Sequence, residues 1–205
     1  MVDMNAVNVK EYGAPPTSRR EIWRYSGVTQ ESPEEAALLA ECLAELEGRL
    51  AYRACWCEFP VSVMGNEVDL GFVRVRSASL AKRLAGCSRA VIFAATVGAQ
   101  LDRLIARYGV LSPAKALLLD TIGTERVEAL CDTVCEDLAA EYAKSGLVTR
   151  PRFSAGYGDL ALSLQRDIFA VLDCPKKIGV SLGAELLMSP AKSVTAIVGV
   201  GYENN

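Results

Sequence analysis

The chain has 205 residues, 51% of them hydrophobic, with a net charge of −3 and a sequence pI of about 5.2. This length predicts one domain with ample material for a core, and the acidic balance disfavours nucleic-acid binding, which usually needs a basic face. No apolar run is long enough to span a bilayer, and the first residues, MVDMNAVNVKEYG, lack the cationic and apolar regions of a signal peptide, so we expect a cytoplasmic protein without membrane or nucleic-acid partners.

The sequence contains no histidine and seven cysteines. The missing histidine excludes His-containing catalytic triads and any metal site that needs imidazole. An odd number of scattered cysteines argues against a disulfide framework. Cys55 with Cys57 on a strand and Cys131 with Cys135 on a helix could each share a face, yet neither pair has a zinc-ribbon or ferredoxin spacing. We expect buried structural thiols and no metal site.

The first quarter of the chain predicts two helices. Residues 17–27 can begin at an N-cap of Thr17 or Ser18 and end near a glycine. Residues 32–50 begin with Ser32 as the N-cap, followed by a proline in the first helical position and two glutamates that suit the positive N-terminal end. Their apolar residues keep a helical period, which supports the second helix further.

The pattern then changes to extended segments. Residues 57–77 alternate apolar and polar side chains around a turn at residues 64–67, which predicts a β-hairpin. Residues 77–86 predict a short helix, and residues 89–98, apolar and β-branched, predict a buried strand. Residues 99–109 predict a helix that ends at its final glycine.

One long helix is predicted over residues 112–146, starting with a Ser-Pro cap. Apolar positions cover much of its surface, so we expect it to be central and buried, and Gly123 is a position where it can bend. Its acidic residues predict a solvated face, from which one side chain could still meet a ligand; they are Glu125, Glu128, Asp132, Glu136 and Asp137.

The stretch RPRFSAGYGD, residues 150–159, is a candidate ligand loop. Gly156 and Gly158 allow positive φ and a close approach of the backbone to a ligand. Arg152 offers a planar fork for a carboxylate or phosphate, and Tyr157 offers a ring and a hydroxyl. The alternative is a turn between helices, with glycines for geometry and arginines in water.

The remaining chain predicts a helix over residues 161–173, for which Asp159 is a possible cap, and extended segments over 176–201. Residues 193–200, SVTAIVGV, predict a strand. Hairpin strands, distant strands and covering helices together predict an α+β fold. The chain has no G-x-G-x-x-G after a strand and no P-loop.

A second candidate site is MSPAKS, in which Ser189 and Lys192 have the Ser-x-x-Lys spacing of penicillin-recognising enzymes. Residues 144–146 imitate the Lys-Thr-Gly of those enzymes. However, the order along the chain is reversed and no Ser-Asp-Asn element lies between them. A turn before the last strand is the simpler interpretation of this segment.

The segment Arg152-Phe-Ser-Ala-Gly-Tyr157 resembles the Arg-x-x-x-Gly-Tyr motif of the reactivation (activation) domain of cobalamin-dependent methionine synthase. Residues 178–200 resemble the Leu-x-Glu-Ser-x-x-Met-x-Pro run and Ser-Val strand of that domain, through Leu182, Glu185, Met188, Pro190, Ser193 and Val194. The helix RREIWRYSG, the Gly-Tyr-Gly-Asp run and its Leu-x-x-Gln continuation, Leu162 and Gln165, are similar to short stand-alone versions of the domain.

This resemblance implies one domain over residues 1–205, with 1–30 as an N-terminal helical extension. It implies helices on a twisted, largely antiparallel sheet, not a Rossmann fold. It also implies a reactivation module that binds S-adenosylmethionine in a shallow groove and docks on a corrinoid-binding methyltransferase or corrinoid protein. The partner carries the cobalamin, whose inactive cob(II)alamin form is reductively methylated with an electron from a flavodoxin-like donor.

The resemblance also implies the ligand contacts. Arg152 would pair with the methionine carboxylate, the backbone at Ser154 would contact the ligand, and Tyr157 would line the groove. Gly156 would let the backbone approach the ligand, and Glu128 would correspond to a glutamate on the long helix of the family. Because cobalt is the nucleophile in the methyl transfer, no catalytic protein base is implied.

Two other functions remain open. The first is a docking module that holds a corrinoid protein and has lost S-adenosylmethionine binding. The second is an unrelated small-molecule enzyme that uses Ser189 and Lys192. Binding of S-adenosylmethionine to the purified protein would separate the reactivation module from the docking module.

Overall fold

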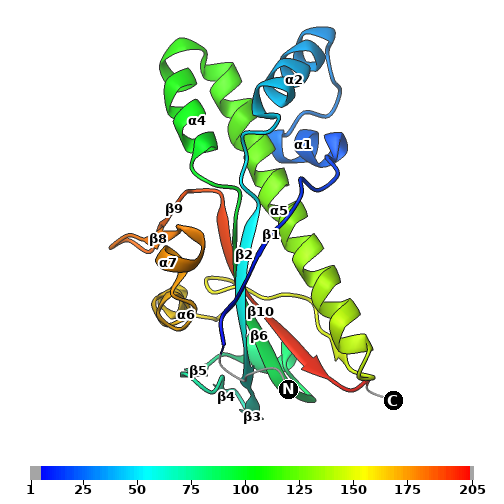
Figure 1. Ribbon diagram of the computed structural model, residues 1–205, viewed down its shortest axis with the longest axis vertical. Helices are drawn as coiled ribbons and strands as arrows, with labels where there is room; N and C mark the ends of the chain where they lie inside the picture. The colour runs from blue at the N-terminus through cyan, green and yellow to red at the C-terminus, as the bar shows by residue number, and fades with distance from the viewer. Residues whose placement is uncertain (1–5, 204–205) are drawn as a thin grey trace.

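The computed structural model describes residues 6–203 and is built on a five-stranded antiparallel sheet (Figure 1). The strand order is β1-β2-β6-β10-β7, so the two longest central strands, β6 and β10, come from distant parts of the chain. The bounds are Asn8–Glu11 for β1, Arg53–Pro60 for β2, Cys87–Thr96 for β6, Val148–Thr149 for β7 and Ser193–Gly201 for β10. This arrangement confirms the predicted α+β fold with its antiparallel sheet.

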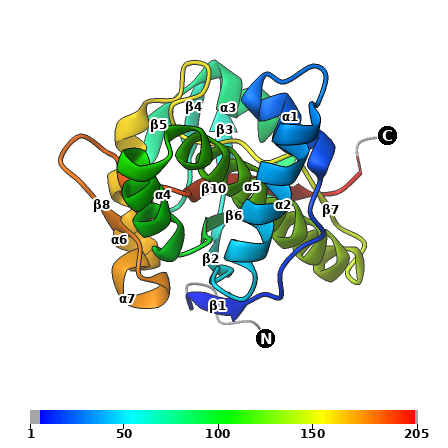
Figure 2. The same ribbon diagram turned by 90° about the horizontal axis from the view of Figure 1, so that it is seen from above.

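One face of the sheet packs against a layer of helices centred on α5, which lies between α4 and α2 in Figure 2. The helices of this layer are α1 (Arg19–Ser26), α2 (Pro33–Leu46), α4 (Gln100–Leu111) and α5 (Pro113–Ala143). Along β6, Val91 and Phe93 face this layer, whereas Ile92 and Ala94 face the opposite one. The strand is therefore buried on both sides, as its continuous apolar sequence predicts.

The other face carries shorter elements, and Figure 1 shows α6 and α7 across the sheet from α5. They are α3 (Ala78–Arg83), a 3₁₀ turn (Leu162–Leu164), α6 (Gln165–Leu172) and α7 (Cys174–Ile178). A small sheet joins β3 (Ser62–Met64), β4 (Glu67–Asp69) and β5 (Arg74–Arg76), and a hairpin joins β8 (Ser181–Leu182) to β9 (Met188–Ser189). The predicted hairpin at 57–77 is confirmed, with β5 as an additional strand.

Helix ends follow the local capping chemistry. Ser18 caps α1, whose C-terminal Gly27 has a φ of 75°, and Ser32 with Glu35 forms a capping box at the start of α2. Two expectations were wrong. Helix α4 continues to Leu111, and residues 176–178, predicted to be extended, belong to α7. The segment before α1 contains strand β1.

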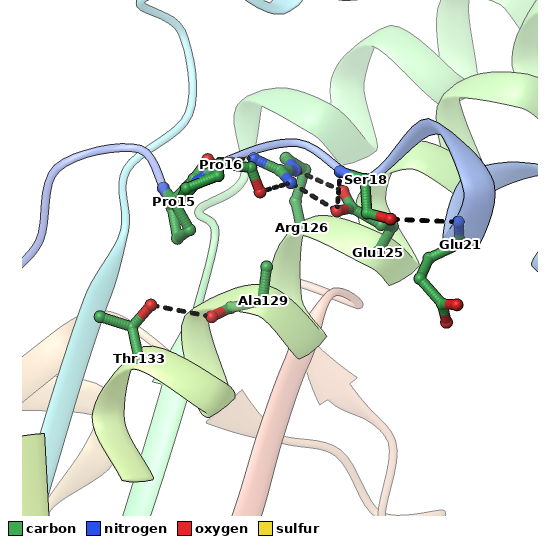
Figure 3. Close-up of polar contacts among 8 residues, drawn as sticks. All are labelled: Pro15, Pro16, Ser18, Glu21, Glu125, Arg126, Ala129 and Thr133. Atoms are coloured by element: carbon green, nitrogen blue, oxygen red, sulfur yellow. Dashed lines mark hydrogen bonds and ion pairs between the residues drawn. The ribbon is translucent and has the colours of Figure 1, made fainter. Parts of the chain in front are cut away.

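The predicted solvated face of α5 was wrong at Glu125, which is only 3% exposed. Figure 3 shows its carboxylate against Arg126, with Nε–Oε2 and Nη2–Oε1 distances of 2.5 Å each. Arg126 also donates to the carbonyls of Pro15 and Pro16 at 2.6 and 2.8 Å, and Ser18 donates its backbone N–H to Glu125 at 2.8 Å. Through these hydrogen bonds, the buried pair connects the segment before α1 to the middle of α5.

Gly123 has a packing role in the uninterrupted helix α5. A Cβ added there would lie 2.2 Å from Cδ2 of Leu101 and 2.9 Å from Cγ of Lys192. Both distances are shorter than van der Waals contact. The glycine therefore allows α4 and the segment before β10 to pack closely on α5.

The cysteines are free thiols, and five of the seven are buried. Burial raises the pKa of the Cys131 thiol well above its ordinary value, and burial also raises that of Cys135. Both are therefore protonated at neutral pH and unlike thiolate ligands. Within residues 6–203 no cluster of three or more Cys, Asp or Glu side chains could hold a metal ion. No helix in that range is long and apolar enough to cross a membrane.

Candidate functional site

An open groove of about 350 Å³ lies where the 150–159 loop passes between α5 and β10. This volume is in the range of small-molecule sites. Its lining comes from α3, α5, the loop, α6, β9 and β10, through Arg83, Glu128, Arg152, Phe153, Ser154, Ala155, Tyr157, Gln165, Met188, Ser193, Val194 and Thr195. The groove therefore joins segments from the middle and the end of the chain.

The first half of the loop runs antiparallel along the edge of β10 that β6 leaves free. Phe153 and Ile197 exchange two backbone hydrogen bonds of 2.9 and 2.8 Å. Three residues earlier in the chain, the Arg150 N–H donates to the carbonyl of Gly199 at 2.8 Å. These bonds fix the register of the loop and place Arg152 beside α5.

The second half of the loop is a tight turn. Gly156 has a φ of 90° and Gly158 a φ of 57°, in the region that favours glycine. A Cβ on Gly158 would lie 2.7 Å from Oγ of Ser79, so this glycine is also needed for packing. The turn leaves the Tyr157 side chain 68% exposed at the rim of the groove.

Asp159 holds this turn against α3 and does not cap the helix that follows it. Its carboxylate accepts from the Ser77 hydroxyl at 2.6 Å and from the backbone N–H groups of Ala78 and Ser79 at 2.6 and 3.1 Å. These hydrogen bonds, the one from Ser77 foremost, keep the pKa of Asp159 well below its usual range. The predicted cap of residues 161–173 was therefore wrong, because Asp159 caps α3 instead.

Arg152 is half-buried between two carboxylates of α5. One Nη atom donates to Glu128 at 2.6 Å and the other contacts Asp132. Burial alone would lower the pKa of Arg152, but the bonds to Asp132 and Glu128 raise it above its ordinary value. The guanidinium is thus a fixed cation, and Glu128 places a negative charge next to it inside the groove.

The structure brings together most of the expected contact residues. Arg152, Ser154, Tyr157 and Glu128 line one groove, and Gly156 shapes the turn without lining it. The sequence patterns did not mark Thr195 as a contact, and they marked Gln165 only through the resemblance. Both line the groove, and the side-chain Oε1 of Gln165 and Oγ1 of Thr195 are buried without a hydrogen-bond partner.

Lys192 is engaged away from Ser189. Its Nζ lies 2.8 Å from Oδ1 of Asp120 and 3.0 Å from Oγ1 of Thr124. Because these two side chains of α5 hold the Nζ, Lys192 is not positioned to remove a proton from the Ser189 hydroxyl. This pairing supports the interpretation of MSPAKS as a turn.

The sequence resemblance implies S-adenosylmethionine binding and cobalamin reactivation, and we expect Ser189→Ala to leave unchanged whatever level of each the protein has. Ser189 is exposed on β9 and does not line the groove. Calorimetry and the reconstitution assay described below measure the two quantities. A loss of either one in a variant that unfolds at the normal temperature would revive the Ser189 and Lys192 hypothesis.

A second depression, of about 550 Å³, adjoins the groove and shares Arg83 and Phe153 with it. It has a cationic lining from Lys82, Arg83 and Arg150. None of these three forms an ion pair within residues 6–203. In a chain of net charge −3, the surface beside the groove is locally positive.

Comparison with solved structures identifies a similar fold. A crystal structure of the MetH reactivation domain bound to AdoHcy superposes with a TM-score of 0.74 at 14% sequence identity, covering 98% of this chain and 80% of that one. The resemblance in the sequence is thus confirmed as a shared fold. No protein-family model matches the chain. No curated protein sequence matches it either.

Proposed function

We propose that this protein is a reactivation module for a corrinoid-dependent methyltransferase, binding S-adenosylmethionine in the groove between α5, the 150–159 loop and β10. The fold shared with the MetH reactivation domain, whose structure holds AdoHcy, supports this type of ligand. The protein's own groove supports the position. We also propose a cytoplasmic setting, consistent with its free thiols.

The observation that carries the proposal is the ion pair of Glu128 and Arg152 inside the groove. The methionine part of S-adenosylmethionine is an α-amino acid, with an ammonium beside a carboxylate. Glu128 suits the ammonium and Arg152 suits the carboxylate, because each charge meets its opposite. The Arg152 fork already holds Asp132 as well, so a ligand carboxylate would take the place of that exposed contact.

The buried polar atoms of Gln165 and Thr195 indicate that the groove suits a ligand with hydrogen-bonding groups. When bound, S-adenosylmethionine supplies the methyl group. One electron from a reductant converts cobalt(II) of the partner's corrinoid to cobalt(I). Cobalt(I) then bonds to the methyl carbon while the carbon–sulfur bond breaks, and S-adenosylhomocysteine leaves. The residues of the protein bind and orient, and no protein base takes part.

The partner must cover the mouth of the groove for the cobalt to reach the methyl group. The adjoining cationic depression favours a partner surface or corrinoid that presents an anion there. A corrinoid-binding methyltransferase or corrinoid protein is the proposed partner. A flavodoxin-like protein is the proposed electron donor.

A reconstitution assay tests the function. Mixing the protein with a cob(II)alamin-loaded methyltransferase, a low-potential reductant and S-adenosylmethionine is expected to produce the methylcobalamin spectrum faster than the same mixture without it. Omitting S-adenosylmethionine should abolish the product. Equal rates with and without the protein would refute the reactivation role.

The docking module remains the second candidate, because the Arg152 fork is already filled by Glu128 and Asp132. Calorimetric titration separates the two functions. Binding of S-adenosylmethionine supports the reactivation module. Corrinoid-protein binding without measurable S-adenosylmethionine binding supports the docking module.

A further inference from the structure

Two of the residues that line the groove each have a buried polar side-chain atom without a hydrogen-bond partner. Among residues 6–203, four buried side-chain atoms lack a hydrogen bond, and two of them are Oε1 of Gln165 and Oγ1 of Thr195. The two side chains are only 6% and 2% exposed. An unsatisfied buried polar group is destabilising, so a pair of them in one groove points to a ligand that satisfies them.

The backbone of Thr195 is directed to the same edge of β10 as the loop contacts. On an antiparallel strand, alternate residues direct both N–H and C=O to the same edge. Ile197 and Gly199 bond to the 150–159 loop, so Thr195, two residues before Ile197, directs its own N–H and C=O to that edge. The loop does not reach them, because after Phe153 it turns back on itself through the bond from Gly156 N–H to the Leu160 carbonyl.

These groups lie at the end of the groove away from the Glu128–Arg152 pair. Helix α5, which supplies Glu128, packs on one face of the sheet, whereas α6, which supplies Gln165, packs on the other. The Thr195 side chain shares the face of Ile197, on the side of α6. The groove thus passes around the free edge of β10 from one face to the other.

We propose that Gln165 and Thr195 form an adenine-reading subsite that receives the exocyclic amine of the ligand's base. The inference rests on the proposed function, which places the amino-acid end of an elongated ligand at Glu128 and Arg152. The nucleoside end then reaches the α6 side. The Gln165 Oε1 and the Thr195 Oγ1 are both able to accept, and the amine of adenine has two N–H donors to satisfy them.

Titration with S-adenosylhomocysteine and S-inosylhomocysteine tests this subsite. The inosyl ligand has a carbonyl oxygen in place of the amine. This oxygen can only accept a hydrogen bond, so it cannot donate to the acceptors of the proposed subsite. We expect the wild-type protein to bind the adenosyl ligand at least tenfold more tightly. Equal affinities would overturn the subsite while leaving the proposed function intact, whereas no binding of either ligand would overturn both.

Gln165→Met and Thr195→Val keep the side-chain volume and remove the polar atoms. Each substitution is expected to weaken the binding of S-adenosylhomocysteine by about five- to tenfold and to leave the weak binding of S-inosylhomocysteine unchanged. Each should also raise the melting temperature of the free protein by about 2–4 °C, because an unsatisfied buried group is lost. If the removed polar atom makes a hydrogen bond within the free protein, the substitution should lower the melting temperature instead.

Ser163→Ala is the matched control, since Ser163 is exposed beside α6 and does not line the groove. It should change neither the affinity nor the melting temperature. If Gln165→Met and Thr195→Val keep the wild-type affinity and preference for the adenosyl ligand, the subsite is overturned. If both variants lose stability, the two polar atoms have internal partners and the inference is overturned as well.

Discussion

Replacing Arg126 by methionine is expected to lower the free energy of unfolding by about 3–5 kcal/mol, because removing one member of a buried ion pair leaves the other charge uncompensated. The Glu125 carboxylate and the carbonyls of Pro15 and Pro16 would lose their donor in an environment where Glu125 is 3% exposed. Urea unfolding followed by circular dichroism measures the change. A loss below about 1 kcal/mol would contradict the importance of the pair.

Lys144→Met is the matched control, because Lys144, the C-cap residue of α5, pairs with Glu141 and both side chains are exposed. Surface pairs contribute little, so this change should stay within about 0.5 kcal/mol. The double variant Glu125→Gln with Arg126→Met should be more stable than Arg126→Met alone. A neutral amide would then replace the unpaired carboxylate and still accept from the Ser18 N–H.

The Glu125–Arg126 pair is a feature that could not be predicted from the sequence. Helix starts such as Ser32 with Glu35 are set by residues within one turn, so their pattern is visible in the chain. Glu125 fits an acidic helix face equally well, and its burial depends on Pro15 and Pro16, more than a hundred residues earlier. No local pattern encodes a contact over that distance.

The candidate site also combines residues that a local sequence pattern marks with residues whose place depends on distant contacts. Arg152 and Tyr157 are candidates from the sequence because a glycine-rich turn with flanking charges is a local signal. Thr195 looks like any residue of an alternating strand, and only its sheet register and the course of the loop show that one strand edge is free there. Asp159 was assigned to the wrong helix because its partner, α3, lies about eighty residues earlier.

Arg152→Ala is expected to lower the affinity for S-adenosylmethionine, measured by calorimetry, by about tenfold to a hundredfold. A charge-assisted hydrogen bond to a carboxylate contributes about 1.5–3 kcal/mol, and this range corresponds to that change in affinity. The loss of the guanidinium would also leave Glu128 and Asp132 unneutralised beside the ligand carboxylate. An unchanged affinity would remove Arg152 from the binding site.

Asp132→Asn gives the sharper control, because Asp132 does not line the groove and its side chain is 65% exposed. It competes with the ligand carboxylate for the Arg152 fork, so its neutral amide should leave the affinity unchanged or tighten it severalfold. Glu128→Gln keeps the shape of the groove but removes the charge proposed for the ammonium, and should weaken binding. If Asp132→Asn weakens binding as much as Arg152→Ala does, Arg152 acts by joining the loop to α5 and not by holding the ligand.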